Sequence, residues 1–149
     1  MTFSTARFGE IEYDNKDVVV FSEGLVGFPQ YTRFLILDHK EGSLFHWLQC
    51  LDEPALAFLV VEPGRVFSGY DPEISDAQAA SLALQPSTET IVLAIVTIPR
   101  GQPQLMTANL AGPLVINAET RQGRQMVLDD ERYWVKQPIF SENAAPVAA

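Results

Sequence analysis

Apolar residues in this chain gather in short runs that are separated by turn-forming residues. The runs are rich in β-branched and aromatic residues, which is typical of strands. Residues 91–98 could be mistaken for a buried helix, but their β-branched content and the flanking Pro99 and Gly101 favour a strand. The predicted strands span residues 18–21, 34–37, 45–51, 57–61, 91–98 and 123–128, preceded by two short strands within residues 1–13 that turn at Gly9-Glu10.

One helix interrupts this pattern. Ser75 and Gln78 have the spacing of a capping box, residues 77–84 are rich in helix formers, and Pro86 ends the segment. The chain therefore predicts a mostly β fold, a small barrel-like antiparallel β structure with one short helix. We expect a single β-barrel domain over residues 1–140. The small and polar residues 141–149 are expected to form a flexible C-terminal tail.

The stretch 107–117 is the predicted centre of this fold, because it reads as a strand end, a tight corner and a second strand. Gly112 is expected to give the corner its backbone freedom. Pro113 fixes φ and lacks a donor, so it belongs at the first residue of a strand. Asn109 and Asn117 bracket the unit, and each is expected to bond neighbouring backbone. With the strands on either side, this unit predicts half of a closed sheet.

The loop 21–29 carries apolar side chains between two glycines. Gly24 and Gly27 flank Leu25, and Phe28 follows directly. These apolar residues either plug one end of the core or form a contact surface. The plug is favoured, because apolar loop residues usually tuck under the chain that they interrupt.

Catalytic and metal-binding motifs are missing from the sequence. His46 and Cys50 are the one pair to consider, but on a strand they stand about 13 Å apart, beyond hydrogen-bond reach. We therefore expect a buried and unreactive Cys50, with no catalytic residue. Two histidines and one cysteine argue against zinc. Calcium at the acidic turns stays open, although no loop has EF-hand spacing. The scattered bases argue against a phosphate-bearing cofactor, so none is expected.

Composition and charge narrow the function further. Hydrophobic residues make up 47% of the chain, and 19 acids against 10 bases give a net charge of −9. This balance argues against direct nucleic-acid binding and favours a basic partner, although simple solubility explains it equally well. The apolar runs are too short for a membrane span and no signal peptide is evident, so we expect a cytoplasmic protein without a membrane partner. The single cysteine fits a reducing compartment.

A series of short motifs runs along the chain. They are Phe21-x-x-Gly24-x-x-Gly27-Phe28, Phe34-Leu35-Ile36-Leu37, Trp47-Leu48-Gln49, Ala57-Phe58, Thr107-Ala108-Asn109-Leu110 and Pro113-Leu114-Val115-Ile116-Asn117. Each motif is weak alone, but their order and spacing over roughly residues 3–140 resemble the flagellar assembly factor FliW family. The motif residues Gly24, Gly27, Phe28, Asn109, Pro113 and Asn117 are expected to be architectural.

The resemblance implies a function in binding rather than catalysis. Proteins of the FliW family bind and antagonise the RNA-binding translational regulator CsrA, and they also bind flagellin. Free flagellin sequesters the factor and leaves the regulator able to repress flagellin translation. For this chain the resemblance implies a non-enzymatic protein, monomeric when free, with CsrA and flagellin as partners.

Two acidic segments are the candidates for partner contact. Aromatic anchors beside like charges suit an interface, and they suit an ordinary edge loop equally well. The candidate residues are Asp52 and Glu53 in one turn and Phe67, Tyr70, Asp71 and Glu73 in another segment.

Two other functions stay open. The first is a flagellin-binding chaperone alone, which a pull-down of purified regulator would distinguish. The second is a small-ligand or flavin-binding β-barrel enzyme, for which yellow colour in the purified protein would be a sign.

Overall fold

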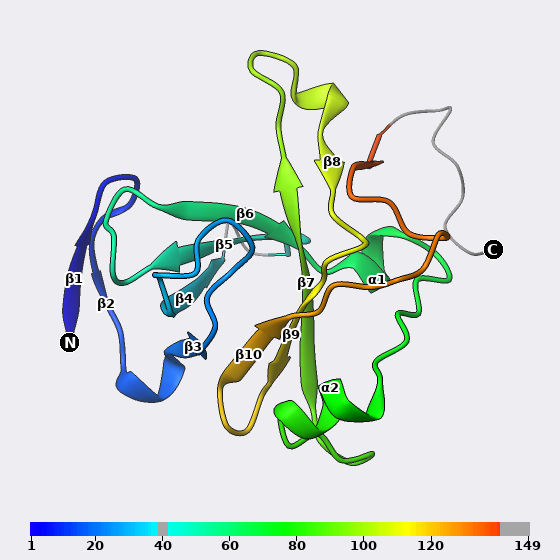
Figure 1. The fold of residues 1–149 in the computed structure, drawn as a ribbon. Helices are drawn as coiled ribbons and strands as arrows, with labels where there is room; N and C mark the ends of the chain where they lie inside the picture. The colour runs from blue at the N-terminus through cyan, green and yellow to red at the C-terminus, as the bar shows by residue number, and fades with distance from the viewer. Residues whose placement is uncertain (39–41, 141–149) are drawn as a thin grey trace.

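The computed structural model describes residues 1–38 and 42–140, and it is mostly β (Figure 1). The described strands are β1 (Thr2–Thr5), β2 (Gly9–Glu12), β3 (Val19–Phe21), β4 (Arg33–Asp38), β5 (Phe45–Cys50), β6 (Ala57–Val61), β7 (Thr90–Thr97), β8 (Thr107–Ala108), β9 (Leu114–Asn117), β10 (Gln122–Gln125) and β11 (Gln137–Pro138). The described helices are α1 (Pro63–Val66) and α2 (Asp76–Ser81), with 3₁₀ turns η1 (Asn15–Asp17) and η2 (Pro103–Leu105). The predicted tail, residues 141–149, lies outside the described residues.

Seven of the described strands close into a barrel. Strands β3 to β7 follow one another as antiparallel neighbours, β9 pairs with β7, and β10 joins β9 to β3. The first half of β7 pairs with β9 and its second half pairs with β6 and β8, so β7 also starts a side sheet that continues to β11. The predicted barrel-like β fold is confirmed.

One strand pair departs from the predicted antiparallel arrangement. β10 runs parallel to β3, with Gly123 opposite Phe21. Parallel neighbours need a long connection between them, and here the connection is most of the barrel itself. Nothing in the local pattern of either strand could indicate this pairing.

The barrel interior is filled by inward-facing side chains from every part of the chain. The central cluster of buried residues comprises Val19, Phe21, Leu25, Phe34, Leu48, Cys50, Val60, Leu93, Leu114 and Ile116. Outside the barrel, Leu35 and Leu51 pack under the β1–β2 hairpin with Phe3 and Ile11. Both faces of β4 are therefore covered, as its unbroken apolar run predicts.

The β1–β2 hairpin turns earlier than predicted. The turn comprises Ala6-Arg7-Phe8, and Gly9 opens β2 with a φ of 68°. Thr5 holds the turn, because its hydroxyl donates to the carbonyl of Gly9 and accepts from the amide of Phe8, at 2.8 Å each. The prediction of a turn at Gly9-Glu10 is therefore wrong.

The predicted helix cap is confirmed, while the helix content differs. Ser75 and Gln78 form the capping box of α2, but the helix ends at Ser81 and Ala83 takes a φ of 53°. A second helix, α1, follows β6, with Pro63 in its first turn. A one-turn helix is too short to show a helical period, so the pattern could not predict it.

The corner at 107–117 has the predicted shape for a partly different reason. Pro113 directly precedes β9, Asn109 accepts from the amide of Ala111, and Asn117 accepts from the amides of Glu119 and Thr120. The φ of Gly112 is not left-handed, which contradicts the expected backbone freedom. An added Cβ there would instead meet the side-chain amides of Asn109 and Gln125 at 3.0 Å each.

The loop between β3 and β4 is a plug, as favoured from the sequence. Leu25 is 2% exposed and belongs to the barrel core. Phe28 is half-buried, and its ring packs edge-on against the ring of Phe58 with the ring centroids 5.2 Å apart. Val26, between the two glycines, is 69% exposed.

We predict that Gly24→Ala destabilises the protein by about 2–5 kcal/mol. The φ of Gly24 is 69°, and a Cβ there would lie 2.5 Å from Cα of Pro29. Gly27→Ala is the control. Gly27 also has a positive φ, 86°, but a Cβ there would meet no atom within 4 Å, so this substitution should lower the free energy of unfolding by only about 1 kcal/mol. Urea unfolding of both variants measures the difference. An equal loss of unfolding free energy in the two variants would contradict the close packing of Gly24 against the backbone of Pro29.

Candidate protein-binding surface

Two segments far apart in the sequence meet beside α2 and form an acidic cleft. The cleft has a volume of about 340 Å³ and is lined by Glu73, Ser75, Gln78, Val127, Leu128, Asp129 and Asp130. Val127 is 69% exposed, so the acidic lining includes an accessible apolar side chain. Carboxylates around an exposed apolar group suit a basic protein partner with apolar side chains.

Tyr70 and Tyr133 fix the segment that forms one wall of this cleft. The Tyr70 hydroxyl donates to the carbonyl of Leu110 at 2.8 Å, and the Tyr133 hydroxyl accepts from the amide of Asp71 at 2.9 Å. The two rings pack edge to face with centroids 4.7 Å apart. Burial raises the pKa of Tyr70, which keeps its hydroxyl protonated as a donor.

The aromatic and acidic residues predicted in this segment therefore have different positions. Phe67 is 8% exposed and lies in a second core cluster with Leu110 and Tyr133, and Tyr70 packs against the same cluster. Asp71 and Glu73 are exposed. The aromatic residues anchor the segment, and the carboxylates are available to a partner.

Two further acids are next to lining residues of the cleft in the sequence. Asp76 begins α2 next to the lining residue Ser75, and Glu131 follows the lining residue Asp130. Arg132 donates to both carboxylate oxygens of Asp130, at 2.7 Å to Oδ2, and these hydrogen bonds lower the pKa of that carboxyl. Asp130 therefore stays ionised near neutral pH, but Arg132 pairs with it, so the negative field of the cleft comes mainly from Glu73 and Asp129.

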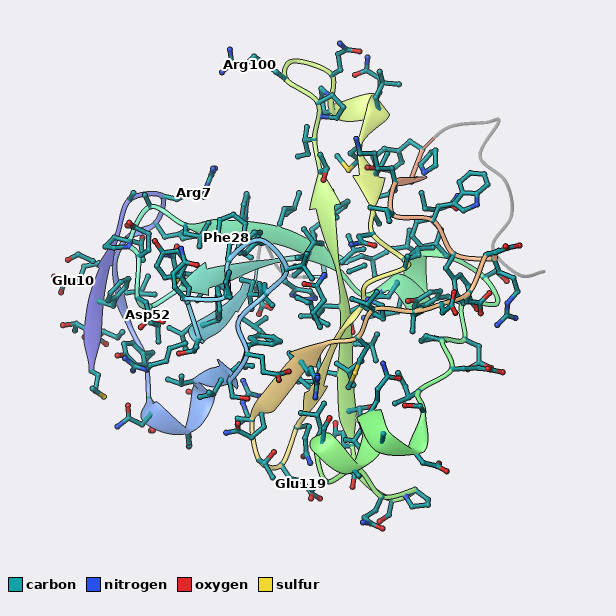
Figure 2. The ribbon with its side chains drawn as sticks, in the orientation of Figure 1. Arg7, Glu10, Phe28, Asp52, Arg100 and Glu119 are labelled. Carbon is teal, nitrogen blue, oxygen red and sulfur yellow. The ribbon has the colours of Figure 1, made fainter. Side chains whose placement is uncertain are left out.

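The other predicted acidic turn lies elsewhere. Asp52 accepts from the amides of Thr32 and Arg33 at 2.9 and 3.1 Å, and Glu53 accepts from the amide of Ala55 at 3.1 Å. Figure 2 shows Asp52 beside the β1–β2 hairpin, well away from α2. The structure therefore does not bring the two predicted acidic segments together, and the carboxylate of Asp52 holds the start of β4.

An apolar groove on the outer face of the sheet was not predicted from the sequence. It has a volume of about 480 Å³ and is lined by Ser43, Leu44, Phe45, Trp47, Leu59, Ile98 and Met106. Arg7 stacks over Trp47 at 4.5 Å, and Ile98 is 44% exposed. Side chains alternate between the two faces of a strand, so the predicted strand 45–51 has Trp47 and Leu48 on opposite faces, and this alternation is the one signal for the groove in the sequence.

Cys50 and His46 lie where the sequence predicts, on β5. Cys50 is fully buried, and burial raises the pKa of its thiol. His46 lies between two carboxylates, with Nδ1 3.1 Å from Asp38 and Nε2 3.3 Å from Glu62. Within residues 1–38 and 42–140, no group of three or more His, Cys, Asp or Glu side chains is placed to hold a metal ion.

Among the helices that the structure describes, none is both long and apolar enough to cross a membrane.

Comparison with known proteins gives one consistent result. A family model described as "FliW protein" matches residues 2–139. The chain is 40% identical over 143 residues to a flagellar assembly factor FliW of Magnetococcus marinus, covering 96% of this chain and 87% of that protein. It is 41% identical over 144 residues to a flagellar assembly factor FliW of Caldanaerobacter subterraneus, covering 95% of each.

A solved structure agrees with these relatives. A crystal structure of the flagellar assembly factor FliW superimposes with a TM-score of 0.87 at 30% sequence identity. The match covers 97% of this chain and 100% of the other.

We predict that Tyr70→Phe lowers the free energy of unfolding by about 1–3 kcal/mol, because the buried carbonyl of Leu110 loses its donor. Tyr31→Phe is the control, since the described residues offer the Tyr31 hydroxyl no hydrogen-bond partner, and it should stay within about 0.5 kcal/mol of the wild type. Thermal unfolding measures both. A Tyr70→Phe protein as stable as the control would show that the hydroxyl does not anchor the cleft.

Proposed function

The chain belongs to the FliW family of flagellar assembly factors, and from this premise we propose that it is a non-enzymatic, cytoplasmic regulator that binds and antagonises CsrA. Binding relieves the repression of flagellin translation. Free flagellin sequesters the protein, which leaves CsrA able to repress flagellin translation. Export of flagellin releases the protein and relieves this repression. The free protein is a monomer, and it does not bind nucleic acid directly.

The acidic cleft is the observation that carries this proposal. A regulator that grips RNA is basic near its RNA site, and the cleft presents the carboxylates of Glu73 and Asp129 with the exposed Val127. Complementary charge steers such partners together and orients them, while the apolar side chain adds contact area. A net charge of −9 extends the attraction beyond the cleft.

Electrostatic exclusion explains how binding would antagonise RNA. A negatively charged protein docked beside an RNA site repels phosphate within about one Debye length, ~8 Å at physiological salt. The protein therefore need not occupy the RNA site itself. Asp71 and Glu73 are both exposed, and Glu73 lines the cleft, so these are the predicted residues that would project this field.

The chemistry of the interior supports a role in binding rather than catalysis. The Cys50 thiol is buried with a raised pKa, which disfavours the nucleophilic thiolate. His46 lies between the carboxylates of Asp38 and Glu62, without a nucleophile among its hydrogen-bond partners in the part of the chain that the structure describes.

A flagellin-binding chaperone without the regulator is the second candidate. The apolar groove at Trp47, Leu59 and Ile98 favours it, because a groove of this kind accepts apolar side chains of a protein segment. The groove and the acidic cleft share no lining residue, so two partners have separate surfaces available. A pull-down with purified CsrA distinguishes the candidates, since only the regulator hypothesis expects capture.

We predict that Asp71→Lys combined with Glu73→Lys weakens CsrA binding about tenfold or more at low salt, mainly through slower association. Both side chains are exposed, so the charge reversal should leave the fold intact. Surface plasmon resonance with immobilised CsrA measures the rates.

The control is Glu10→Lys combined with Glu12→Lys on β2. Both side chains are exposed, and the pair makes the same change in net charge on the far side of the barrel from α2 (Figure 2). Its binding should change far less. Equal losses in the two variants would assign the effect to overall charge, and full affinity of the Asp71/Glu73 variant would reject this surface.

A further inference from the structure

A second charged cleft has the opposite sign. It lies on the outer face of the barrel, where η1, β3, β4 and the β9–β10 turn come together, and its volume is about 440 Å³. Its lining residues are Asn15, Lys16, Val18, Val20, Arg33, Glu119, Thr120, Arg121 and Gln122. The lining includes three basic residues, Lys16, Arg33 and Arg121, and one acidic residue, Glu119, although the net charge of the chain is −9.

Strand register explains why these bases converge. Val20 stands opposite Arg33 of β4 on one side and opposite Gln122 of β10 on the other. Paired residues share one face of a sheet, and Val19 and Phe21 are fully buried in the barrel, so Val20 and its partners face outward. The unusual parallel pairing of β3 with β10 therefore builds the cleft.

Arg121 is held firmly, and among the described residues its side chain forms no ion pair. Its φ is 62°, its amide donates to the carbonyl of Asn117, and its Nη2 donates to the carbonyl of Asp17 at 2.9 Å. Its Nε is buried without a hydrogen-bond partner among the described residues. A guanidinium whose buried N–H has no acceptor carries an electrostatic cost, and a nearby anion would offset it.

The other bases of the cleft are equally uncompensated. Within the described parts of the chain, neither Lys16 nor Arg33 forms an ion pair through its side chain. Other arginines of this protein do: Arg65 pairs with Glu62, Arg124 with Glu23 and Arg132 with Asp130. The cleft therefore concentrates cations that have no ion-pair partner in the part of the chain that the structure describes.

We propose that this cleft binds a carboxylate side chain from an acidic segment of a protein partner. Guanidinium groups match the geometry of a carboxylate, and the lining residues Val18 and Val20 suit the aliphatic part of a Glu side chain. Glu119, at the β9–β10 turn, disfavours a multiply charged anion such as phosphate or a nucleic-acid backbone. The protein thus has a receptor for one acidic residue in addition to its negative surface.

The test uses the full 149-residue chain and a capped peptide, acetyl-Leu-Glu-Leu-Glu-Leu-amide. Titration followed by ¹H–¹⁵N NMR should shift the amides of Lys16, Arg33 and Gln122 and the Nε–H of Arg121, saturating in the millimolar range. The peptide with Gln in place of Glu should produce no such shifts. Shifts of the same size with the Gln peptide, or none with the Glu peptide, would overturn the proposal.

Two matched variants locate the site. Lys16→Gln combined with Arg33→Gln should weaken binding of the Glu peptide about tenfold or more. Arg100→Gln combined with Lys136→Gln makes the same change in net charge at exposed residues outside the cleft, and Arg100 lies at the opposite end of the molecule from Glu119 (Figure 2). This control should bind as the wild type does. Equal weakening in both variants, or inorganic phosphate binding as tightly as the peptide, would contradict a carboxylate site.

Discussion

The pairing of β7 with β9 is the constraint on which the rest of the structure depends. Four consecutive pairs, from Thr90 opposite Asn117 to Leu93 opposite Leu114, join the middle of the chain to its C-terminal third. This ladder returns β10 to the edge of β3 and closes the barrel. A closed sheet has no free edge, so every barrel strand is paired on both sides and the surface is fixed in shape.

Both charged clefts follow from this closure. The parallel pair β3–β10 places Arg121 beside η1 and Arg33. Leu110 lies just before β9, and its carbonyl accepts a hydrogen bond from the Tyr70 hydroxyl. The amide of Asp71 donates to the Tyr133 hydroxyl, so these two bonds hold the acidic segment next to residues 127–133. One scaffold therefore presents an acidic cleft and a basic cleft that share no lining residue. For a protein proposed to act by being bound, a rigid arrangement of charge is the useful property, because little ordering cost is added on association.

Local features of this fold could be predicted from the sequence, and long-range ones could not. The strand runs, the Ser75–Gln78 capping box and the position of Pro113 depend on neighbouring residues. The capping box and Pro113 are confirmed and each predicted strand occurs, although the last one covers Gln122–Gln125 and does not include residues 126–128. The parallel β3–β10 pair and the packing reason for Gly112 depend on residues far away in the chain. Of the candidate contact residues, Asp71 and Glu73 are exposed and Glu73 lines the acidic cleft, but only the fold shows that Asp129 and Asp130 line the same cleft.

The measurement that tests the proposed function most directly is the affinity of CsrA for its RNA, with and without this protein, at about 50 mM and about 500 mM salt. Docking of the protein on CsrA is followed in parallel at both concentrations. We expect the protein to weaken RNA binding strongly at low salt and much less at high salt, at matched occupancy of CsrA, because screening shortens the reach of its negative field. An equal loss of RNA affinity at both salt concentrations, with docking intact, would contradict electrostatic exclusion.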